Sequence, residues 1–565
     1  MKKLLFLLLG FLCLSLHAHA QVSYGGTPYS LGSNFTAMPL ARVSLPTYQV
    51  PMLDMPSVRR QDRETINSNR FASATAVEVS PYTSGLWQDL PTGDRLWRVQ
   101  IQLQGAEVSG MRLFFDAFIL PEGGRLFIYS PNHQIMLGAF TEKSNRAHQN
   151  FATTLLNSQT IILEYIEPAG RQGQTQLHLN RIDQAYRQVG NMSKPRNDKS
   201  SINPTSPEDF GSSGSCNLNV NCTTLADNWR DEQRGAVRIL TVDNSGSNYC
   251  SGSLIRNTNK DNKPYILTAY HCTEDATVAH LNNWTFDFNY QISNCNNQNT
   301  SPSNTQNITG STMRGQYSPS DFALLELQEN VPTTFNPYYN GWDRTGVSSA
   351  GAVCIHHPAG DVKKFTLDTD QNSTNSYYND LPNDNTHFRQ VWNNGTTEGG
   401  SSGSPLFNST GNIIGQLHGG DAFCNAPNSP DWFGKVSVSW TGGSGAASRL
   451  SDWLDPTGSG ASTLNGSNIE TPTHIENNKL DSPFKVYPNP SNGLAYLAYE
   501  QGIWGGQTVA IALYQLTGKL AYEATYTLST EVGKMAIPFK NLPTGMYILH
   551  IKTEKGIFKH KLMIE

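Results

Sequence analysis

The sequence has few charged residues and no excess of positive charge. Asp, Glu, Lys and Arg make up only 15% of its 565 residues, and the formal net charge is −5. A domain that binds nucleic acid usually has a basic footprint, so this composition argues against a nucleic-acid partner. Glycine is plentiful, with 48 residues, and asparagine, serine and threonine abound as in secreted β-rich proteins. A chain of this length is expected to fold as three or four domains.

Long apolar runs are also lacking. The apolar run from Leu4 to Leu16 is too short for a membrane-spanning helix. Two lysines precede it and Ala18-His19-Ala20 follows it, so residues 1–20 are predicted to be a cleaved signal peptide. Cys13 is expected to be lost with this segment, because the leucine before it is not the small residue of a lipoprotein signal. We therefore expect a soluble mature protein with no transmembrane segment.

Cysteines are scarce and confined to one region. Seven of the eight lie beyond the signal peptide, between positions 216 and 424. Such clustering in a secreted chain indicates disulfides, but six cysteines allow 15 connectivities, so their spacing alone does not choose among them. Cys354 lies in an apolar run and is expected to be a buried, unreactive thiol. The seven are Cys216, Cys222, Cys250, Cys272, Cys295, Cys354 and Cys424.

A glycine- and serine-rich stretch stands ahead of an apolar run at residues 398–405, Glu-Gly-Gly-Ser-Ser-Gly-Ser-Pro. Its glycines would let the backbone turn tightly and expose the hydroxyl of Ser402. The N–H groups of Gly400 and Ser402 would then point at a developing oxyanion. Clusters of Gly and Ser are usually only loops, so this motif needs partners elsewhere in the chain.

Two such partners precede it. His271 ends the apolar segment 264–270, and Asp321 begins the apolar segment 322–327. The chain order His, Asp, Ser is that of chymotrypsin and differs from the orders of subtilisins and α/β-hydrolases. We therefore predict that Ser402 is the nucleophile and His271 the general base. Asp321 would orient the imidazole, and the N–H groups of Gly400 and Ser402 would form the oxyanion hole.

Several further segments carry a resemblance to bacterial lysyl endopeptidases of the chymotrypsin fold, and together they span residues 211–457. They are Gly214–Asn217, Leu267–Cys272, His356–Asp361, Gly400–Pro405, Gly415–Gly420, Ser439–Gly443 and Ser448–Pro456. The resemblance implies an all-β, chymotrypsin-like double β-barrel with two six-stranded antiparallel barrels. It also implies a serine endopeptidase that cleaves after lysine and needs no cofactor.

The same resemblance implies a disulfide pattern. Its pairs are Cys216–Cys424, Cys222–Cys295 and Cys250–Cys272. The third pair would clamp the loop that carries His271.

Lysine specificity requires an acid in the substrate pocket. Trypsin carries this acid six positions before the nucleophile, where this chain has Thr396. The resemblance instead places it at Asp431, within the segment 430–436. A partly desolvated carboxylate that faces a substrate ammonium discriminates strongly, because a neutral side chain would leave it buried and unpaired. Glu398 is the competing acid.

The segment that follows Gln416 is expected to bind the substrate. Gly419 and Gly420 would offer their backbone to an extended peptide as an added antiparallel strand. The resemblance implies that His418 lies near Asp321 and the pocket and stacks on a tryptophan, for which Trp392 is a candidate.

The pair His356-His357 superficially suggests a metal site. No third ligand stands at a suitable spacing, so no metal is expected.

Residues 21–210 form a separate β-rich region. Strand-like segments separated by Gly and Pro turns recur from residue 96 to residue 166, and little structure is expected before residue 70. We interpret this region as a pro-domain that assists folding and delays activity, which would make the chain a zymogen. A carbohydrate- or partner-binding module is the alternative. Residues 190–210 are predicted to be a cleavable linker.

The chain changes character after residue 457. Residues 458–483 are rich in Gly, Ser, Thr and Asn and are predicted to be a flexible linker, and residues 484–565 a small β-sandwich. Tyr-Pro-Asn-Pro at 487–490 and Leu-Pro-Thr-Gly-Met-Tyr at 542–547 resemble the C-terminal sorting domain of type IX secretion. This implies that the secretion machinery is a partner and carries the chain from the periplasm across the outer membrane. An adhesive or carbohydrate-binding module is the alternative.

The sequence thus predicts a secreted, monomeric serine endopeptidase that acts on protein or peptide substrates and cleaves after lysine. Two alternatives stay open. One is an inactive protease-like protein that serves adhesion, and the other is an endopeptidase of Arg or Glu specificity.

Overall fold

The computed structural model forms two compact units, Met1–Glu470 and Thr471–Glu565, each of which is described by itself. In the part of the chain that the structure describes, no helix is both long and apolar enough to cross a membrane. The described residues are 25–32, 43–64, 69–187, 213–292, 306–379, 384–426, 428–469, 483–515, 519–539, 542–553 and 556–565. The predicted signal peptide and the whole of the predicted cleavable linker, residues 190–210, lie outside these residues.

Residues 47–187 form two sheets that share one hydrophobic core. The first sheet has the order β1 (Thr47–Gln49), β4 (Arg95–Gln102), β9 (Thr160–Glu167), β6 (Arg125–Tyr129) and β7 (Met136–Phe140), and β3 (Leu86–Asp89) also pairs with β4. The second has the order β2 (Arg70–Val79), β10 (Gln176–Ala185), β5 (Gly110–Ile119) and β8 (Phe151–Ala152). We call residues 47–187 the N-terminal domain.

Strand β4 shows the alternation of residues from which β structure was predicted in this region. Val99 and Ile101 are buried in the core, whereas Arg98 and Gln100 alternate with them and are half-buried. One element was not expected from the sequence. Helix α2 (Met55–Glu64) lies in the stretch for which little structure was predicted, and it buries Met55 and Val58.

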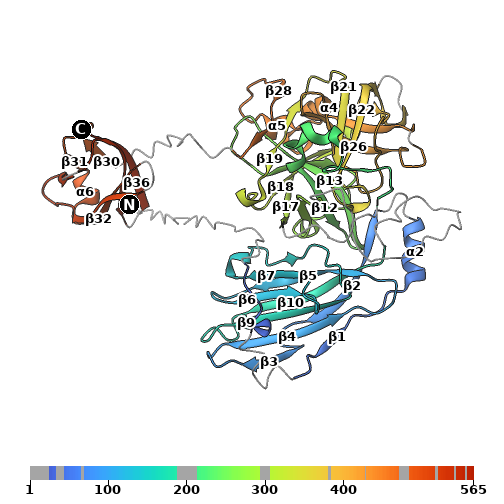
Figure 1. Ribbon diagram of the computed structural model, residues 1–565, viewed down its shortest axis with the longest axis horizontal. Coiled ribbons are helices and arrows are strands. Elements are labelled where there is room, and N and C mark those ends of the chain that lie inside the picture. Colours follow the sequence, from blue (N-terminus) through green and yellow to red (C-terminus); the bar gives the residue numbers. More distant parts are fainter. Residues whose placement is uncertain are drawn as a thin grey trace, which may run out of the picture. The chain divides into compact units, whose positions relative to one another are not determined.

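The first of the two expected barrels follows. Its six strands pair antiparallel in the order β15, β12, β13, β14, β18 and β17, and β16 (Asn307–Thr309) extends it beyond β15. Their bounds are β12 (Ala236–Val242), β13 (Gly246–Ile255), β14 (Tyr265–Ala269), β15 (Thr285–Phe288), β17 (Ser311–Tyr317) and β18 (Phe322–Leu327). Strand β2 pairs with β13, so one sheet runs from the N-terminal domain into this barrel (Figure 1).

The second barrel has six antiparallel strands in the order β22, β21, β25, β26, β27 and β24, flanked by β11 (Leu218–Asn219) and β23 (Ser373–Asn375). Their bounds are β21 (Ala350–His356), β22 (Lys364–Gln371), β24 (His387–Gln390), β25 (Pro405–Phe407), β26 (Asn412–Gly420) and β27 (Asp431–Lys435). Short helices α4 (Val436–Thr441) and α5 (Ser451–Leu454) follow. The expected all-β, double-barrel architecture is confirmed.

The structure differs from the sequence-based expectation just after residue 457. Strand β28 (Thr463–Leu464) pairs with β20 (Gly341–Asp343), and β29 (Ser467–Asn468) pairs with β19 (Tyr338–Tyr339). These pairs tie the first part of the predicted linker to the protease region. Gly, Ser and Asn are common both in linkers and in short edge strands. The composition of this segment therefore did not distinguish between the two.

The second unit is a small β-sandwich, as predicted. One sheet contains β30 (Phe484–Tyr487), β31 (Leu494–Tyr499) and β34 (Lys534–Pro538). The other contains β33 (Leu520–Thr527), β32 (Thr508–Gln515), β35 (Gly545–Thr553) and β36 (Gly556–Ile564). Both sheets contribute to one core, which includes Trp504 of α6 (Gln501–Trp504).

Candidate active site

Two of the three predicted catalytic residues lie at the ends of neighbouring strands. His271 follows β14 and Asp321 precedes β18, and the two strands pair antiparallel so that Ala269 lies opposite Phe322. The backbone N–H of Tyr270 donates to the carbonyl of Asp321 at 2.7 Å. Pairing two buried apolar strands therefore brings together residues that are fifty positions apart in the chain.

Asp321 holds the imidazole of His271 in one orientation. Its Oδ2 lies 2.9 Å from Nδ1 of His271, and its Oδ1 accepts the backbone N–H of His271 at 3.0 Å. Asp321 is 1% exposed. Burial opposes protonation of the imidazole, but the charge of Asp321 and its hydrogen bond outweigh this effect, so the pKa of His271 is raised. Nε2 is left for proton transfer.

Ser402 stands on the tight turn that the glycines predicted. Gly403 has φ +81°, and a Cβ there would lie 2.2 Å from Oγ1 of Thr268, so only glycine fits. The carbonyl of Ser402 accepts the N–H of Ser251 in β13 at 2.8 Å. Oγ of Ser251 donates to the carbonyl of Gly400 at 3.0 Å. Strand β13 thus holds the turn that carries Ser402 through two hydrogen bonds.

A disulfide brings the histidine and the serine together. Cys250 of β13 is bonded to Cys272, as predicted. Sγ of Cys272 lies 4.0 Å from Nε2 of His271 and 4.0 Å from the carbonyl oxygen of Ser402. The predicted bond Cys216–Cys424 is also present. The third predicted pair stays a prediction, because Cys295 lies outside the described residues.

Cys354 has the expected surroundings. It is fully buried in β21, and burial raises the pKa of its thiol. Its sulfur lies 3.1 Å from Oγ of Ser404.

The histidine pair at the end of β21 lies near the turn that carries Ser402. Nδ1 of buried His356 lies 2.8 Å from Oγ of Ser401, and its Nε2 lies 2.9 Å from Oγ1 of Thr366. Burial lowers the pKa of His356 to about 3, so the ring is neutral at pH 7. Nδ1 of His357 lies 2.9 Å from the carbonyl oxygen of Asp361. Both rings are therefore engaged in hydrogen bonds within the protein.

Asp431 is the buried acid of the site. It begins β27 and is 1% exposed. Its Oδ2 accepts hydrogen bonds from Nε1 of Trp392 at 2.6 Å and from Oγ1 of Thr397 at 2.7 Å. Within the described ranges, Oδ1 has no hydrogen-bond partner. Burial raises the pKa of Asp431 to about 6, although these two hydrogen bonds and the nearby backbone N–H of Ala422 lower it. Oδ1 is thus a buried carboxylate oxygen that no donor among the described residues reaches with normal hydrogen-bond geometry.

One of the two glycines predicted to bind substrate, Gly420, lies against this acid. Asp431 pairs with Gly420 across β26 and β27, and a Cβ at Gly420 would lie 2.2 Å from Oδ1 of Asp431. A Cβ at Gly419 would lie 2.9 Å from the hydroxyl of Tyr377. Glycine at position 420 therefore allows Asp431 to lie this close to the backbone of β26, and glycine at position 419 does the same for Tyr377.

The competing acid, Glu398, binds the backbone of Gly214 rather than lying beside Asp431. Both of its carboxylate oxygens lie 3.2 Å from the backbone N of Gly214, and its Oε1 lies 3.6 Å from Sγ of Cys424. It fixes the segment beside the Cys216–Cys424 disulfide. Burial raises the pKa of Glu398 despite the N–H of Gly214.

His418 lies near Asp321, as the resemblance implied, and it also lies beside His271. Its ring stacks on His271 with a centroid distance of 5.7 Å, and its Nε2 lies 4.0 Å from Oδ1 of Asp321. The prediction that a tryptophan stacks on His418 is wrong. The ring of Tyr377 stacks on it instead, with a centroid distance of 3.6 Å and an interplanar angle of 9°. Trp392 instead binds Asp431.

Sequence reasoning missed three residues of this site. Tyr377 lies in an irregular segment with no periodic pattern, and Thr397 adjoins the position where trypsin carries its acid. His387 was not considered, yet its Nε2 lies 3.0 Å from Nδ1 of His418. Only the pairing of β24 with β27 brings it there.

Comparisons with known proteins agree with this geometry. Residues 210–434 match the family model "Lysyl endopeptidase, C-terminal domain", and residues 485–565 match "Secretion system C-terminal sorting domain". A lysyl endopeptidase of Pseudomonas aeruginosa is 26% identical over 403 residues, which are 68% of this chain and 80% of that protein. Secreted RxLR effector protein 73 of Plasmopara viticola is 26% identical over 189 residues, or 32% of this chain and 44% of that protein.

Two solved protease structures are also similar. The thermostable serine protease AL20 from an extremophilic microorganism is 14% identical with a TM-score of 0.27, covering 36% of this chain and 92% of that chain. The protease Anisep of Arthrobacter nicotinovorans is 16% identical with a TM-score of 0.27, covering 36% of this chain and 90% of that chain.

The resemblance to lysyl endopeptidases is thereby confirmed, and the chain is a serine endopeptidase. The sorting domain confirms that the chain is secreted, and it implies an interaction with the type IX secretion machinery.

Proposed function

We propose that this endopeptidase hydrolyses peptide bonds on the carboxyl side of lysine through Ser402, His271 and Asp321. The observation that carries the proposal is Oδ1 of Asp431, a buried carboxylate oxygen without a hydrogen-bond donor among the described residues. An oxygen of this kind is costly unless a cation pairs with it. The ammonium of a lysyl side chain would supply that pairing.

The proposed mechanism begins with acylation. Nε2 of His271 takes the proton of Ser402 while Oγ attacks the scissile carbonyl. The N–H groups of Gly400 and Ser402 stabilise the oxyanion of the tetrahedral intermediate. His271 then gives its proton to the leaving amine, and the acyl group stays on Ser402. Asp321 stabilises the imidazolium throughout, in keeping with the raised pKa of His271.

Deacylation reverses these roles. Water replaces the leaving amine, His271 takes one of its protons, and the acyl bond to Ser402 is hydrolysed. The free carboxylate of the new C-terminal lysine is released, and the serine regains its proton.

Specificity follows from the surroundings of Asp431. Trp392 and Thr397 bind Oδ2 and fix the carboxyl group, and Oδ1 lies against the backbone of Gly420. In this proposal the lysyl side chain enters a space next to Oδ1. A substrate strand that pairs with His418, Gly419 and Gly420 would deliver its side chain to this space. Glu398 binds Gly214 instead, which supports Asp431 as the specificity residue.

In this proposal residues 21–210 are a pro-region and residues 211–457 the protease domain. The chain is cut between them during maturation, after export through the signal peptide at residues 1–20. The sorting region 484–565 follows the segment 458–483, and the enzyme acts as a monomer.

Peptide mapping of an unfolded, disulfide-free protein substrate tests the proposal. We expect cuts only after lysine in the wild-type digest and none with Ser402→Ala. Equal cutting after arginine, or cutting after glutamate, would contradict the lysine assignment while leaving the endopeptidase activity in place.

A further inference from the structure

The N-terminal domain joins the first barrel by strand addition. Strand β2 pairs with β13, so that Gly246 lies opposite Ser73 and Ser247 opposite Ala72. The N–H of Ala74 adds a hydrogen bond to the carbonyl of Ser245 at 3.1 Å. Gly246 has φ +155°, and a Cβ there would lie 1.8 Å from the carbonyl oxygen of Ala72. This approach therefore requires glycine at position 246.

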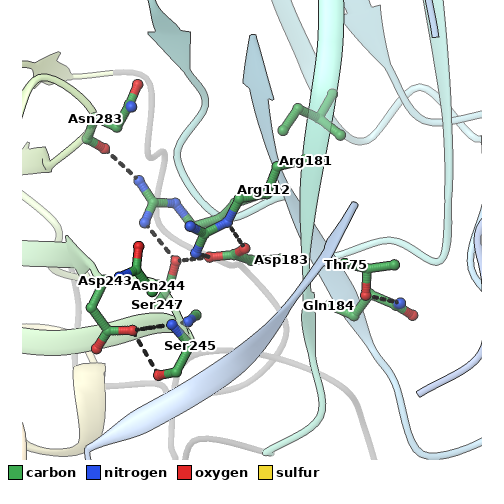
Figure 2. Close-up of polar contacts among 12 residues, drawn as sticks. Thr75, Arg112, Arg181, Asp183, Gln184, Asp243, Asn244, Ser245, Ser247 and Asn283 are labelled. Atoms are coloured by element: carbon green, nitrogen blue, oxygen red, sulfur yellow. Dashed lines mark hydrogen bonds and ion pairs between the residues drawn. The ribbon is translucent and has the colours of Figure 1, made fainter. Parts of the chain in front are cut away.

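A fully buried arginine crosses the junction. Arg112 of β5 is 0% exposed, and its guanidinium points from the N-terminal domain into the protease region (Figure 2). Nη1 donates to Oγ of Ser247 at 2.8 Å, and Nη2 donates to the carbonyl of Asn283 at 3.1 Å and to Oγ1 of Thr285 at 3.0 Å. Nε donates to the carbonyl of Thr153 within the N-terminal domain at 3.1 Å.

The charge of Arg112 is retained and balanced. Burial lowers its pKa only to about 10, because Asp183 and Asp287 favour the charged form. Asp183 is also 0% exposed and accepts the hydroxyl of Ser247 at 2.6 Å, so Ser247 bridges the two charged residues (Figure 2). Arg181 pairs with the same carboxylate at 2.6 Å.

Other contacts extend the junction. Arg146 of the N-terminal domain pairs with Glu329, which follows β18, at 2.5 Å, and this pair is almost fully buried, at 9% and 1% side-chain exposure. Phe71 stacks on Tyr249 of β13 at 4.0 Å. Phe114 belongs to the core of the first barrel. Shared apolar cores and paired buried charges are features of permanent interfaces rather than of transient ones.

The described contacts leave the catalytic groups uncovered. They lie on β12, β13, β15, β16 and the end of β18, and the apolar cluster at the junction also includes Ala359, which follows β21. In residues 47–187 no contact to His271, Ser402 or Asp431 is seen, and the side chain of His271 stays 33% exposed. Binding at this junction is thus compatible with an open catalytic site.

We propose that the N-terminal domain is a non-covalently held subunit of the protease, and that it stays bound at the β13 edge after the chain is cut between residues 187 and 213. The β13 edge is the surface formed by Gly246, Ser247, Tyr249, Asn283 and Thr285. Its occupant is strand β2 together with the guanidinium of Arg112. Loss of this occupant would expose an unpaired sheet edge and leave buried polar groups without partners.

The proposal takes from the proposed function only the cut itself, and the experiment supplies that cut. A recognition sequence for an unrelated, highly specific protease replaces residues 200–206 in a Ser402→Ala chain, which cannot digest itself. After cleavage, size-exclusion chromatography is run at low micromolar concentration in physiological salt. We expect the two fragments to co-elute at the position of the uncut chain and to separate only in denaturant. Separation in native buffer would overturn the proposal.

Two variants locate the interaction. Arg112→Met should speed dissociation of the cut protein about 100-fold, since removing one partner of a buried charged pair leaves the other unpaired. Arg125→Met is the matched control, because Arg125 lies exposed on β6, and it should dissociate at the wild-type rate. Gly246→Ala tests the same junction from the protease side should Arg112→Met fail to fold. Wild-type dissociation rates in both junction variants would contradict the assigned surface.

Because the readout is association of inactive protein, its failure would leave the catalytic proposal intact. Loss of lysine specificity would likewise leave the interface proposal intact.

Discussion

The indole N–H of Trp392 donates a hydrogen bond to Oδ2 of Asp431 at 2.6 Å. The sequence had suggested Trp392 as the ring that stacks on His418, and the structure gives that place to Tyr377. The tryptophan instead fixes the buried acid, so that only the other carboxylate oxygen lacks a donor. Several predictions about catalysis, pH dependence and stability depend on this arrangement.

Removal of the nucleophile should abolish turnover. Ser402→Ala is expected to lower kcat on a lysyl p-nitroanilide about 10⁴-fold or more, because no other hydroxyl replaces Oγ in the triad. The variant should keep both disulfides and the wild-type circular dichroism spectrum. Ser401→Ala is the matched control, with a far smaller loss, since Ser401 binds His356 rather than substrate. Wild-type turnover by Ser402→Ala would refute the assignment.

The pH profile should depend on the substrate. His271, whose pKa is raised, must lose its proton to act as a base, and this limits every substrate on the acid side. Asp431, with a pKa of about 6, must also be ionised to bind lysine. The acid limb of kcat/KM should therefore be steeper for a lysyl ester than for an uncharged ester of similar size. Identical acid limbs for the two esters would contradict this role of Asp431.

The ionised carboxylate of Asp431 should lower the free energy of unfolding at neutral pH. Its pKa rises from an ordinary 3.8 to about 6 on folding, which corresponds to a cost on the order of 3 kcal/mol above pH 6. The folded state binds the proton more tightly, so this cost is absent below pH 4 and grows as pH rises toward 6. Asp431→Asn should therefore unfold at higher urea concentration than wild type at pH 8, with a smaller difference at pH 4. A urea midpoint of Asp431→Asn that is equal to or below that of wild type at pH 8 would contradict a destabilising carboxylate at this position.

The ring on His418 should matter modestly. Tyr377 stacks on it at 3.6 Å, and such a pair contributes about 0.5–1.5 kcal/mol. Tyr377→Ala should thus lower kcat/KM on lysyl substrates roughly 3- to 10-fold, whereas Tyr377→Phe should keep the wild-type value because it preserves the stack. Stopped or continuous anilide assays of the two variants measure the ratio. Equal losses in both would assign the effect to the hydroxyl rather than to stacking.

The barrels could be predicted from the sequence because local patterns encode them, and the predicted triad rests on local patterns of the same kind. His271 and Asp321 each stand at the end of a buried strand, and Ser402 stands in a glycine-rich turn. A local sequence pattern therefore marks each of the three positions. The partners of Asp431 were harder to find. Trp392 and Thr397 reach it only because β24 pairs with β27 and the nucleophile loop folds back, and such long-range pairing leaves no local signal.

The N-terminal domain shows the same limit. Its strands were predicted from alternation and turns, as in β4. Its junction with β13 was not predicted, because Arg112 reads as an ordinary strand residue until its partners Ser247 and Asn283 are known. The expectation that this region delays activity stays a prediction, and its described contacts lie away from the triad.

Lysine recognition by Asp431 is tested most directly by one specificity ratio. We would measure kcat/KM for a lysyl and a norleucyl p-nitroanilide that are otherwise identical, with wild type, Asp431→Asn and Glu398→Gln. The account predicts that Asp431→Asn lowers the Lys/norleucine ratio at least 100-fold, because the ammonium loses its only buried charged partner among the described residues. Glu398→Gln should keep the wild-type ratio, since Glu398 binds Gly214. A ratio that collapses in Glu398→Gln and survives in Asp431→Asn would contradict the account.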